Sequence, residues 1–280
     1  MSVSAAQPEL IGRWQVLHTV ARGGTATVYA VVDPQSGERF AIKMLTEPGP
    51  SVVRLIREYR ALTRIDHPNI VRVYELGHSE QGLPFVVMEL VEGVAAQVRV
   101  KRTGTPGSPR RTAEATRIAY EIALALDHVH ARAMVHRDLK SSNVVVRSDG
   151  CAKLLDFGTV LRMNARGPPP PTHDFVGTFA YASPEQITGE AVDARSDLYS
   201  LGVLLFRMLC GRLPFDVEDP HELAQSHLGT PPPDPAVLVP VLPRSLADLV
   251  LVLLQKHPAD RPQDASSVAD RLASLLPGGG

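Results

Sequence analysis

The sequence predicts an α+β protein with a small β-rich lobe followed by a larger helical lobe. Two observations predict this architecture: alternating and β-branched stretches dominate the first part of the chain, and apolar residues at helical spacing dominate after Gly93. The 280 residues are enough for one large domain or for two lobes that share a boundary. We expect an N-terminal extension, an N-lobe, a hinge, a C-lobe and a tail over residues 1–10, 11–88, 89–93, 94–276 and 277–280.

The N-lobe is expected to hold short strands with one helix among them. Gly23-Gly24 offers a hairpin turn, and a second turn begins at Asp33-Pro34. A helix is expected over 52–65, because apolar residues there recur at helical spacing and Pro68 follows. The strands are expected at 13–21, 25–32, 40–45, 71–76 and 84–90.

Helices are expected to dominate the C-lobe. The stretch 198–209 is apolar nearly all round, which is typical of a helix buried at the centre of a domain. Asp219 and Pro220 suit the N-cap and the first turn of another helix. Further helices are expected at 112–133, 244–256 and 263–276, and surface loops at 103–109, 165–172 and 230–243.

Composition and charge narrow the class of protein. Hydrophobic residues make up 44% and charged residues 21% of the chain, which is ordinary for a globular protein. The net charge of −1 gives no overall field that would attract nucleic acid or acidic lipid, so we expect neither as a partner. There is no signal-peptide pattern, the apolar stretch 198–209 is too short to span a bilayer, and only two cysteines occur. We therefore expect a cytoplasmic protein.

The strongest chemical signal is the motif HRDLKSSN at 136–143. Shorter motifs lie on either side of it: Ala41-Ile42-Lys43, Asp156-Phe157-Gly158, Gly177-Thr178 and Ser183-Pro184-Glu185. In order and spacing these motifs resemble those of the eukaryotic-type protein kinases, over about residues 11–275. The phrase YASPEQ at 181–186 is most similar to the bacterial, Hanks-type serine/threonine branch.

The resemblance implies a set of residues for phosphoryl transfer. Asp138 would accept or orient the proton of a substrate hydroxyl, and the simpler alternative is a capping residue. Lys140 would lie beside the transferred phosphate, which is a serine/threonine-type signature. Asn143 and Asp156 would bind Mg²⁺, or Mn²⁺ in its place, through oxygen atoms.

The resemblance also implies an ATP site built largely from the N-lobe. Lys43 would contact the α- and β-phosphates and pair with Glu58 on the expected helix, whereas the simpler alternative is a surface ion pair. The adenine would meet Val28, Ala41, Val145, the gatekeeper Met88 and the hinge residues Glu89 and Val91. For the apolar members of this set, the simpler alternative is packing in the core.

The glycine-rich loop departs from the family pattern GxGxxGxV, which falls on residues 21–28. Only Gly23 is kept in register, because Ala21 and Ala26 stand at the other two glycine positions. Glycine lets backbone N–H groups approach phosphate closely, so these departures bear on the affinity for ATP. A plain hairpin is the alternative. Nucleotide contacts are still expected from Val20, Ala21, Arg22, Gly23, Gly24, Thr25, Ala26, Thr27 and Val28.

Other motif residues are expected to hold the active site together. By resemblance, His136 and Phe157 would join Leu62 and Val73 in a stack that Asp197 anchors to the buried helix. Glu185 and Arg261 would form a buried ion pair, whose loss would strand one charge. The expected structural residues are His136, Arg137, Phe157, Gly158, Thr178, Glu185, Asp197 and Arg261.

Control of activity is expected between Asp156 and Glu185. In the family, an arginine such as Arg137 before the base marks kinases switched by phosphorylation of this segment. Of the candidates Thr159, Thr172 and Thr178, we set Thr178 aside because it is expected to bond Asp138. We select Thr172, which lies five residues before Gly177 and directly after the prolines 168–171; the alternative is an ordinary loop threonine. The basic segment 99–111 is expected to be a solvated loop rather than an anion-docking site.

The function implied is transfer of the γ-phosphoryl group of MgATP to serine or threonine hydroxyls of proteins, including the chain itself. There are two alternatives. One is a nucleotide-binding pseudokinase scaffold, which Ala21 and Ala26 support, and the other is a small-molecule kinase of related fold. The segment from Gly177 to Glu185 speaks against the small-molecule kinase, because it shapes a peptide platform in protein kinases. Input is expected from an activating partner or from self-association.

Overall fold

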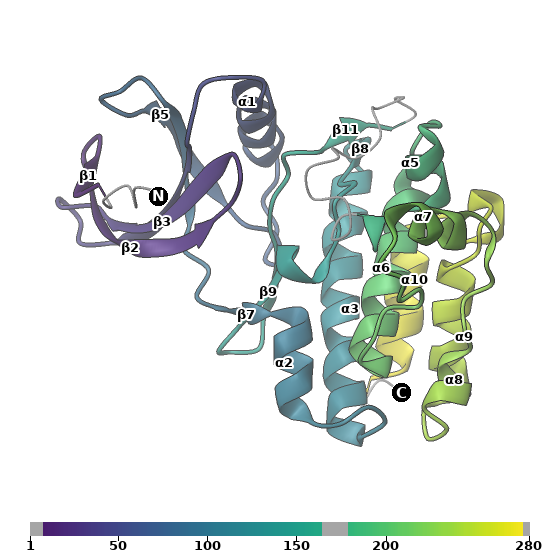
Figure 1. The fold of residues 1–280 in the computed structure, drawn as a ribbon. Helices are drawn as coiled ribbons and strands as arrows, with labels where there is room; N and C mark the ends of the chain where they lie inside the picture. Colours follow the sequence, from purple (N-terminus) through teal and green to yellow (C-terminus); the bar gives the residue numbers. More distant parts are fainter. Residues whose placement is uncertain (1–7, 164–178, 277–280) are drawn as a thin grey trace. The chain divides into compact units, whose positions relative to one another are not determined.

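A computed structural model describes residues 8–163 and 179–276 of the chain. The chain divides into two compact units (Figure 1). The first unit runs to Asp66 and resumes at Ile70–Glu92, whereas the second consists of His67–Asn69 and the chain from Gly93 onward. Each unit has its own secondary structure and its own buried residues, and each is described here by itself.

The first unit is a six-stranded antiparallel sheet with one helix. Its strand order is β1-β2-β3-β4-β6-β5, and the helix α1 spans Ser51–Leu62 and packs on β5 and β6. The strands are Leu10–Ile11, Trp14–Arg22, Ala26–Val32, Arg39–Leu45, Val73–His78 and Pro84–Glu89, from β1 to β6. The core on one face of this sheet is built from Ile11, Trp14, Tyr29, Val31, Ile42, Phe85 and Val87.

The second unit is mainly helical. Its helices are α2 Ala96–Thr103, α3 Pro109–His130, α5 Pro184–Thr188, α6 Ala194–Cys210, α7 Pro220–Gly229, α8 Pro235–Leu238, α9 Arg244–Leu253 and α10 Ala265–Ser274. As its apolar sequence predicts, α6 is buried, and it packs against α3 and α9. In the described part of the chain, no helix combines the length and the apolar character that crossing a membrane requires.

Short strands lie around the motif at 136–143 in the second unit. The strands β7 (Gly93–Ala95), β9 (Val144–Arg147) and β10 (Ala152–Leu154) form a sheet in the order β10-β9-β7. A second ladder pairs β8 (Met134–Val135) with β11 (Leu161–Arg162). Asn69 is bound to β10, because its carbonyl accepts from the Leu154 N–H at 2.8 Å and its side-chain amide donates to the Ala152 carbonyl at 2.9 Å.

Several predicted boundaries in the second unit are wrong. Helix α3 begins at Pro109 rather than Thr112. Ser108 is its N-cap residue, and Pro109 is its first residue, a position that proline favours. The short helix α8 lies inside the expected loop 230–243, started by the Asp234 side chain accepting from the Ala236 N–H. The predicted helix at 263–276 is shorter, because the Asp264 side chain caps α10.

The interpretation of segment 99–111 as a solvated loop is confirmed only for residues 104–108 and is wrong for the rest. Its first part is the last turn and a half of α2, whose buried residues Ala96 and Val100 lie four positions apart on one face. Arg99 pairs with Glu114 at 2.7 Å. Arg111 is buried and donates to the Met208 carbonyl at the end of α6 and to the Gly104 carbonyl. Burial lowers the pKa of Arg111, and its contacts serve the packing of α2, α3 and α6.

We predict that Gly202→Ala destabilises the second unit by about 1–3 kcal/mol. A Cβ atom added at Gly202 would lie 2.7 Å from the Leu253 Cβ atom, so α6 and α9 would have to move apart. Urea unfolding followed by circular dichroism measures the change. Gly229→Ala is the matched control, since a Cβ atom there meets nothing within 4 Å. Equal stability of the two variants would contradict the close packing of α6 on α9.

Candidate active site

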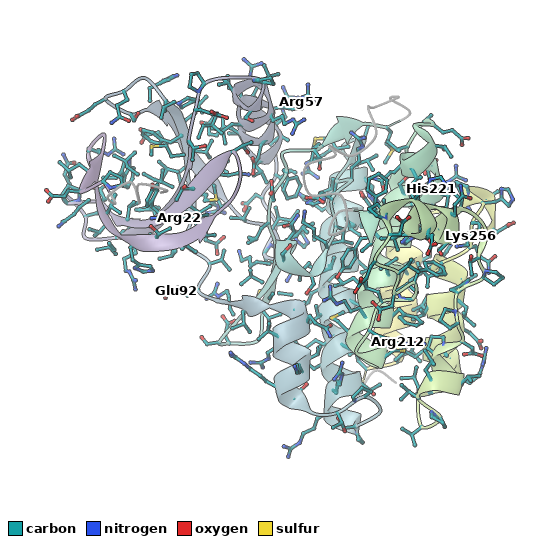
Figure 2. All side chains as sticks on the ribbon, in the orientation of Figure 1. Arg22, Arg57, Glu92, Arg212, His221 and Lys256 are labelled. Carbon is teal, nitrogen blue, oxygen red and sulfur yellow. The ribbon has the colours of Figure 1, made fainter. Side chains whose placement is uncertain are left out.

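A lysine and a glutamate meet in the first unit. The Lys43 Nζ atom donates to Glu58 Oε1 at 3.0 Å and to Oε2 at 2.8 Å. Lys43 lies on β4, a strand paired on both edges, and Glu58 lies on the buried face of α1 with an exposed fraction of 3%. Neighbouring Arg57 points to solvent (Figure 2). The predicted Lys43–Glu58 contact is therefore present, and it is partly buried rather than a surface pair.

Strand register gathers the predicted ATP-site residues of the first unit on one face of the sheet. Val28 lies opposite Lys43, and Ala41 lies opposite Ala30 on β3 and opposite Met88 on β6. Because side chains alternate along a strand, these residues share a face, and the core residues Tyr29, Ile42 and Val87 occupy the other face. Of the predicted hinge residues, Glu89 ends β6 and Val91 follows it. Val145 lies on β9 in the second unit.

The glycine-rich segment is a hairpin between β2 and β3. Ala21 lies opposite Val28 and Arg22 opposite Thr27, and the Gly23 N–H donates to the Ala26 carbonyl at 2.9 Å. Neither Gly23 nor Gly24 has a positive φ, so the hairpin itself does not require glycine at these positions. A Cβ atom at Gly24 would meet nothing within 4 Å. The two glycines thus leave two of the three positions at the tip, 23 and 24, without side chains.

In the second unit, the motif at 136–143 folds around Asp138. The carboxylate of Asp138 accepts from the Lys140 Nζ atom at 3.0 and 2.9 Å, and one of its oxygens accepts from the Asn143 side-chain amide at 2.9 Å. The same Asn143 nitrogen donates to the Asp138 carbonyl at 2.8 Å. Asn143 itself is fixed in a turn of 3₁₀ helix, Ser141–Asn143. Residues two and five positions after Asp138 are thereby brought onto its carboxylate.

The surroundings of Asp138 change the pKa of its carboxyl group. Burial raises the pKa of Asp138, Lys140 opposes that rise through its charge and hydrogen bond, and the negative charge of Asp156 adds to it. Asp156 is thus near enough to Asp138 for their charges to interact. A carboxylate with a raised pKa is a stronger proton acceptor than an exposed aspartate.

The predicted metal ligands Asn143 and Asp156 are linked through the backbone. The Leu155 N–H donates to the Asn143 carbonyl at 2.8 Å, which holds the residue before Asp156 beside the 3₁₀ turn. Asp156 has a φ of 59°, a strained conformation that is typical of functional sites. One carboxylate and one amide oxygen fit Mg²⁺, which usually takes one or two carboxylates and completes its octahedron with phosphates and water.

Asp197 holds the backbone before the predicted base. Its two oxygens accept from the N–H groups of His136 and Arg137, each at 2.8 Å, and it also bonds His130 Nε2 at 2.8 Å. Burial alone would raise the pKa of Asp197, but hydrogen bonding and charge from His130, charge from His136 and the Arg137 N–H lower it overall. The predicted anchor is thus present, and His130 is a member that sequence reasoning missed.

The aromatic part of the predicted stack is also present within the second unit. The rings of His136 and Phe157 meet edge to face, with centroids 4.7 Å apart, and both residues are buried. Thr159 donates from its hydroxyl to the His136 carbonyl at 2.9 Å. Leu62 and Val73 are buried in the first unit. Thr172 and Thr178 lie outside the described residues.

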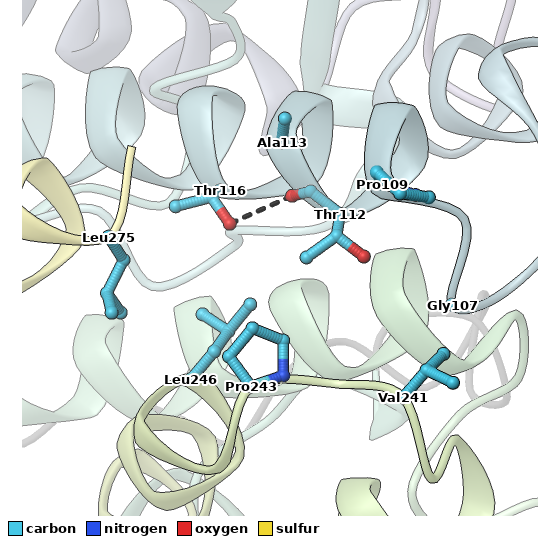
Figure 3. A pocket seen from close by; sticks show the side chains of 9 residues that line it. All are labelled: Gly107, Pro109, Thr112, Ala113, Thr116, Val241, Pro243, Leu246 and Leu275. Carbon is cyan, nitrogen blue, oxygen red and sulfur yellow. Dashed lines mark hydrogen bonds between the residues drawn. The ribbon is translucent and has the colours of Figure 1, made fainter. Parts of the chain in front are cut away.

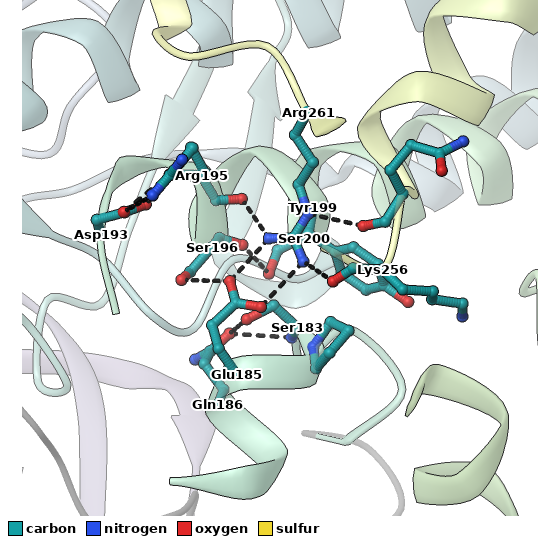
Figure 4. Close-up of polar contacts among 12 residues, drawn as sticks. Ser183, Glu185, Gln186, Asp193, Arg195, Ser196, Tyr199, Ser200, Lys256 and Arg261 are labelled. Atoms are coloured by element: carbon teal, nitrogen blue, oxygen red, sulfur yellow. Dashed lines mark hydrogen bonds and ion pairs between the residues drawn. The ribbon is translucent and has the colours of Figure 1, made fainter. Parts of the chain in front are cut away.

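The predicted ion pair of Glu185 and Arg261 is bidentate and buried (Figure 4). Arg261 Nη1 and Nη2 lie 2.7 and 2.9 Å from the two Glu185 oxygens, and the Ser196 hydroxyl donates to Oε1 at 2.7 Å. Arg261 also donates to the backbone carbonyls of Gln255, Arg195 and Lys256. Burial alone would raise the pKa of Glu185, but Arg261 and Ser196 lower it overall. The pair joins α5 to α6 and to the segment before α10.

A separate pocket of about 260 Å³ lies in the second unit, at the start of α3 (Figure 3). Thr112 and Thr116 line it from α3, Pro243 and Leu246 from the start of α9, and Leu275 from the residue after α10. The Thr116 hydroxyl is already bonded to the Thr112 carbonyl at 2.8 Å. The nine residues that line the pocket carry no charged side chain, and none of them belongs to the motifs described above.

The comparisons identify the class of protein to which this fold and these motifs belong. The protein kinase domain family matches residues 14–272, so the chain belongs to the protein kinase family. It is 36% identical over 263 residues to the DNA damage-responsive serine/threonine-protein kinase RqkA of Deinococcus radiodurans, which covers 93% of this chain and 39% of that protein. It is 34% identical over 261 residues to the serine/threonine-protein kinase PrkC of Bacillus subtilis, covering 92% of this chain and 39% of PrkC. The chain thus spans about two fifths of the length of these relatives.

We predict that Arg261→Met costs about 3–5 kcal/mol of stability, because it leaves the Glu185 carboxylate buried without its cation. Glu185→Met should cost a similar amount. The double variant should cost clearly less than the sum of the two, since neither charge is then stranded. Urea unfolding of the four proteins at pH 7 measures the coupling. Additive single effects would show that the pair is not energetically coupled.

Proposed function

We propose that this chain transfers the γ-phosphoryl group of ATP to serine or threonine hydroxyls of proteins. The observation that carries the proposal is the Asp138 cluster, in which one partly buried carboxylate is contacted by Lys140 and by Asn143 and interacts with the charge of Asp156. Phosphoryl transfer needs a group that orients the nucleophile, cations that offset phosphate charge, and oxygen ligands for a metal. The residues of this cluster supply each of these.

The roles follow from the chemistry of each side chain. Asp138 would orient the substrate hydroxyl and accept its proton, and the ammonium group of Lys140 would face the transferred phosphate. Asn143 and Asp156 would hold Mg²⁺ through oxygen, and Mn²⁺ could replace it. The metal ion, when bound, offsets the negative charge of the phosphates.

In the first unit, Lys43 would contact the α- and β-phosphates. Glu58 holds its ammonium group in place with two hydrogen bonds. The shared face of Val28, Ala41 and Met88 offers an apolar surface for the adenine.

Substrate class and setting are part of the proposal. Lys140 two positions after Asp138, together with relatives that are named serine/threonine-protein kinases, supports protein hydroxyls as acceptors. Autophosphorylation would fall on Thr172, and activation would come from a partner or from self-association. A cytoplasmic setting is supported by the cysteines Cys151 and Cys210, which are both free thiols.

We predict that the purified protein incubated with MgATP gains phosphate on Thr172, and that Asp138→Asn abolishes this gain. Loss of the proton acceptor should lower the rate by about 10²–10⁴-fold. Intact mass and peptide sequencing locate the phosphate, and the shift in melting temperature with MgATP reports nucleotide binding. The Asp138→Asn variant should keep that shift.

Other outcomes of this experiment separate the alternatives. A transfer rate in Asp138→Asn equal to that of the unmodified protein would refute the role of Asp138. MgATP could raise the melting temperature of the unmodified protein while no phosphate reaches either the chain or an added protein substrate. This result would favour the nucleotide-binding scaffold. If MgATP does not raise the melting temperature, the hairpin with Ala21 and Ala26 at its glycine positions does not support nucleotide binding.

We predict that Lys140→Met moves the acidic limb of the pH–rate profile to higher pH. Lys140 lowers the pKa of Asp138, so its removal lets burial and Asp156 raise that pKa further, and Asp138 becomes protonated at a higher pH. The limb is measured from kcat/KM for a peptide substrate. The control is Lys101→Met, which removes an exposed lysine from α2 and should leave the limb in place. An unmoved limb in Lys140→Met would contradict the role of Asp138 as proton acceptor.

A further inference from the structure

Gln186, on α5, is a buried amide with three hydrogen bonds (Figure 4). Its Oε1 atom accepts from the Ser183 N–H and from the Ser183 hydroxyl, each at 3.1 Å. Its Nε2 atom donates to the Arg137 carbonyl at 2.8 Å. An N–H group can only donate and a carbonyl can only accept, so these partners fix which end of the amide faces which. Gln186 therefore connects α5 to the residue directly before Asp138.

Arg137 needs such support because its backbone is strained. Its φ of 70° lies in the left-handed region, which is unfavourable for a residue with a side chain. The N–H group of Arg137 is held by Asp197 from α6, and its carbonyl is held by Gln186 from α5. Two separate elements thus hold the two backbone polar groups of one strained residue.

The peptide plane between Arg137 and Asp138 is fixed at both of its polar ends. Gln186 binds the carbonyl oxygen, and the Asp138 N–H donates to His136 Nδ1 at 3.3 Å. The Asp138 side chain starts from this plane, so rotation of the plane would redirect the carboxylate. The plane therefore sets how Asp138 is presented to a substrate hydroxyl.

A capping role alone does not account for glutamine at this position. Ser183 and Gln186 form a capping box, in which the residue at N3 of the helix only needs to accept hydrogen bonds. Glutamate serves that purpose equally well. Only the amide can also donate to the Arg137 carbonyl. Meanwhile α5 is already fixed by the adjacent Glu185 through Arg261 and Ser196.

We propose that Gln186 is a positioning residue for Asp138, acting through the Arg137 carbonyl. This inference rests on the proposed kinase function for its kinetic consequence. Through Gln186, the seating of α5, which follows the predicted control segment, is coupled to the orientation of the proton acceptor. Loss of this hydrogen bond should therefore reduce turnover while leaving nucleotide binding intact.

The test uses Gln186→Glu, which keeps an acceptor for the capping box and removes the donor to Arg137. We expect kcat to fall at least about tenfold, since small displacements of a catalytic group can cost up to about 10²-fold, while KM for ATP stays within about twofold. Gln186→Met removes the same donor without adding a charge, and it decides the case should the glutamate variant fail to fold. The matched control is Gln225→Glu at an exposed position of α7, which should not change kcat.

Hydrogen–deuterium exchange of the peptide covering 134–140 gives a readout that does not depend on activity. Faster exchange in both Gln186 variants, with a melting temperature close to that of the unmodified protein, is the expected result. Unchanged kcat in folded variants would overturn the positioning role and leave the kinase function standing. If the unmodified protein transfers no phosphate, the proposed function fails. In that case hydrogen–deuterium exchange still tests the link from Gln186 to Arg137, because unchanged exchange at 134–140 would overturn it.

Discussion

One buried carboxylate, Asp197, organises the second unit. It is fully enclosed, and its oxygens accept from two consecutive backbone N–H groups and from the His130 ring. A buried charge without such partners would be costly, so the carboxylate and the strained backbone that it binds require each other. Because Asp197 belongs to the buried helix α6, the backbone before Asp138 is held from the centre of the unit.

Sequence reasoning predicted contacts among the candidate site residues better than it predicted the polar residues that support them. Lys43, Glu58, Asp138, Asn143 and Asp156 stand in motifs whose spacing is characteristic, and the structure brings Asn143 onto Asp138 and Glu58 onto Lys43. His130 and Gln186 were missed, because each acts through one hydrogen bond to a residue far away in the sequence. For Gln186 a local signal existed, since Ser183 three positions earlier indicates a capping box.

The errors in the fold have a common physical cause. Helix α2 carries arginine and lysine, which have good helix propensity, but their positive charge led to the interpretation of a solvated loop. Its apolar face is short, and tertiary contacts of Ala96 and Val100 with the rest of the unit determine its conformation. Arg111 was interpreted as solvated because charge predicts exposure. It is buried because its guanidinium satisfies carbonyls where two elements end.

Because of the short stretch His67–Asn69, the two units do not correspond to two continuous pieces of the sequence. This stretch lies between segments of the first unit in the sequence but belongs to the second in space. Its Asn69 carbonyl is the acceptor for the Leu154 N–H, two residues before Asp156. No single cut in the coding sequence therefore releases the helical unit whole, and a fragment starting at Gly93 would leave the Leu154 N–H without its acceptor, two residues before Asp156. Recombination between kinase genes at the 92/93 boundary would combine His67–Asn69 from one parent with the rest of the second unit from the other.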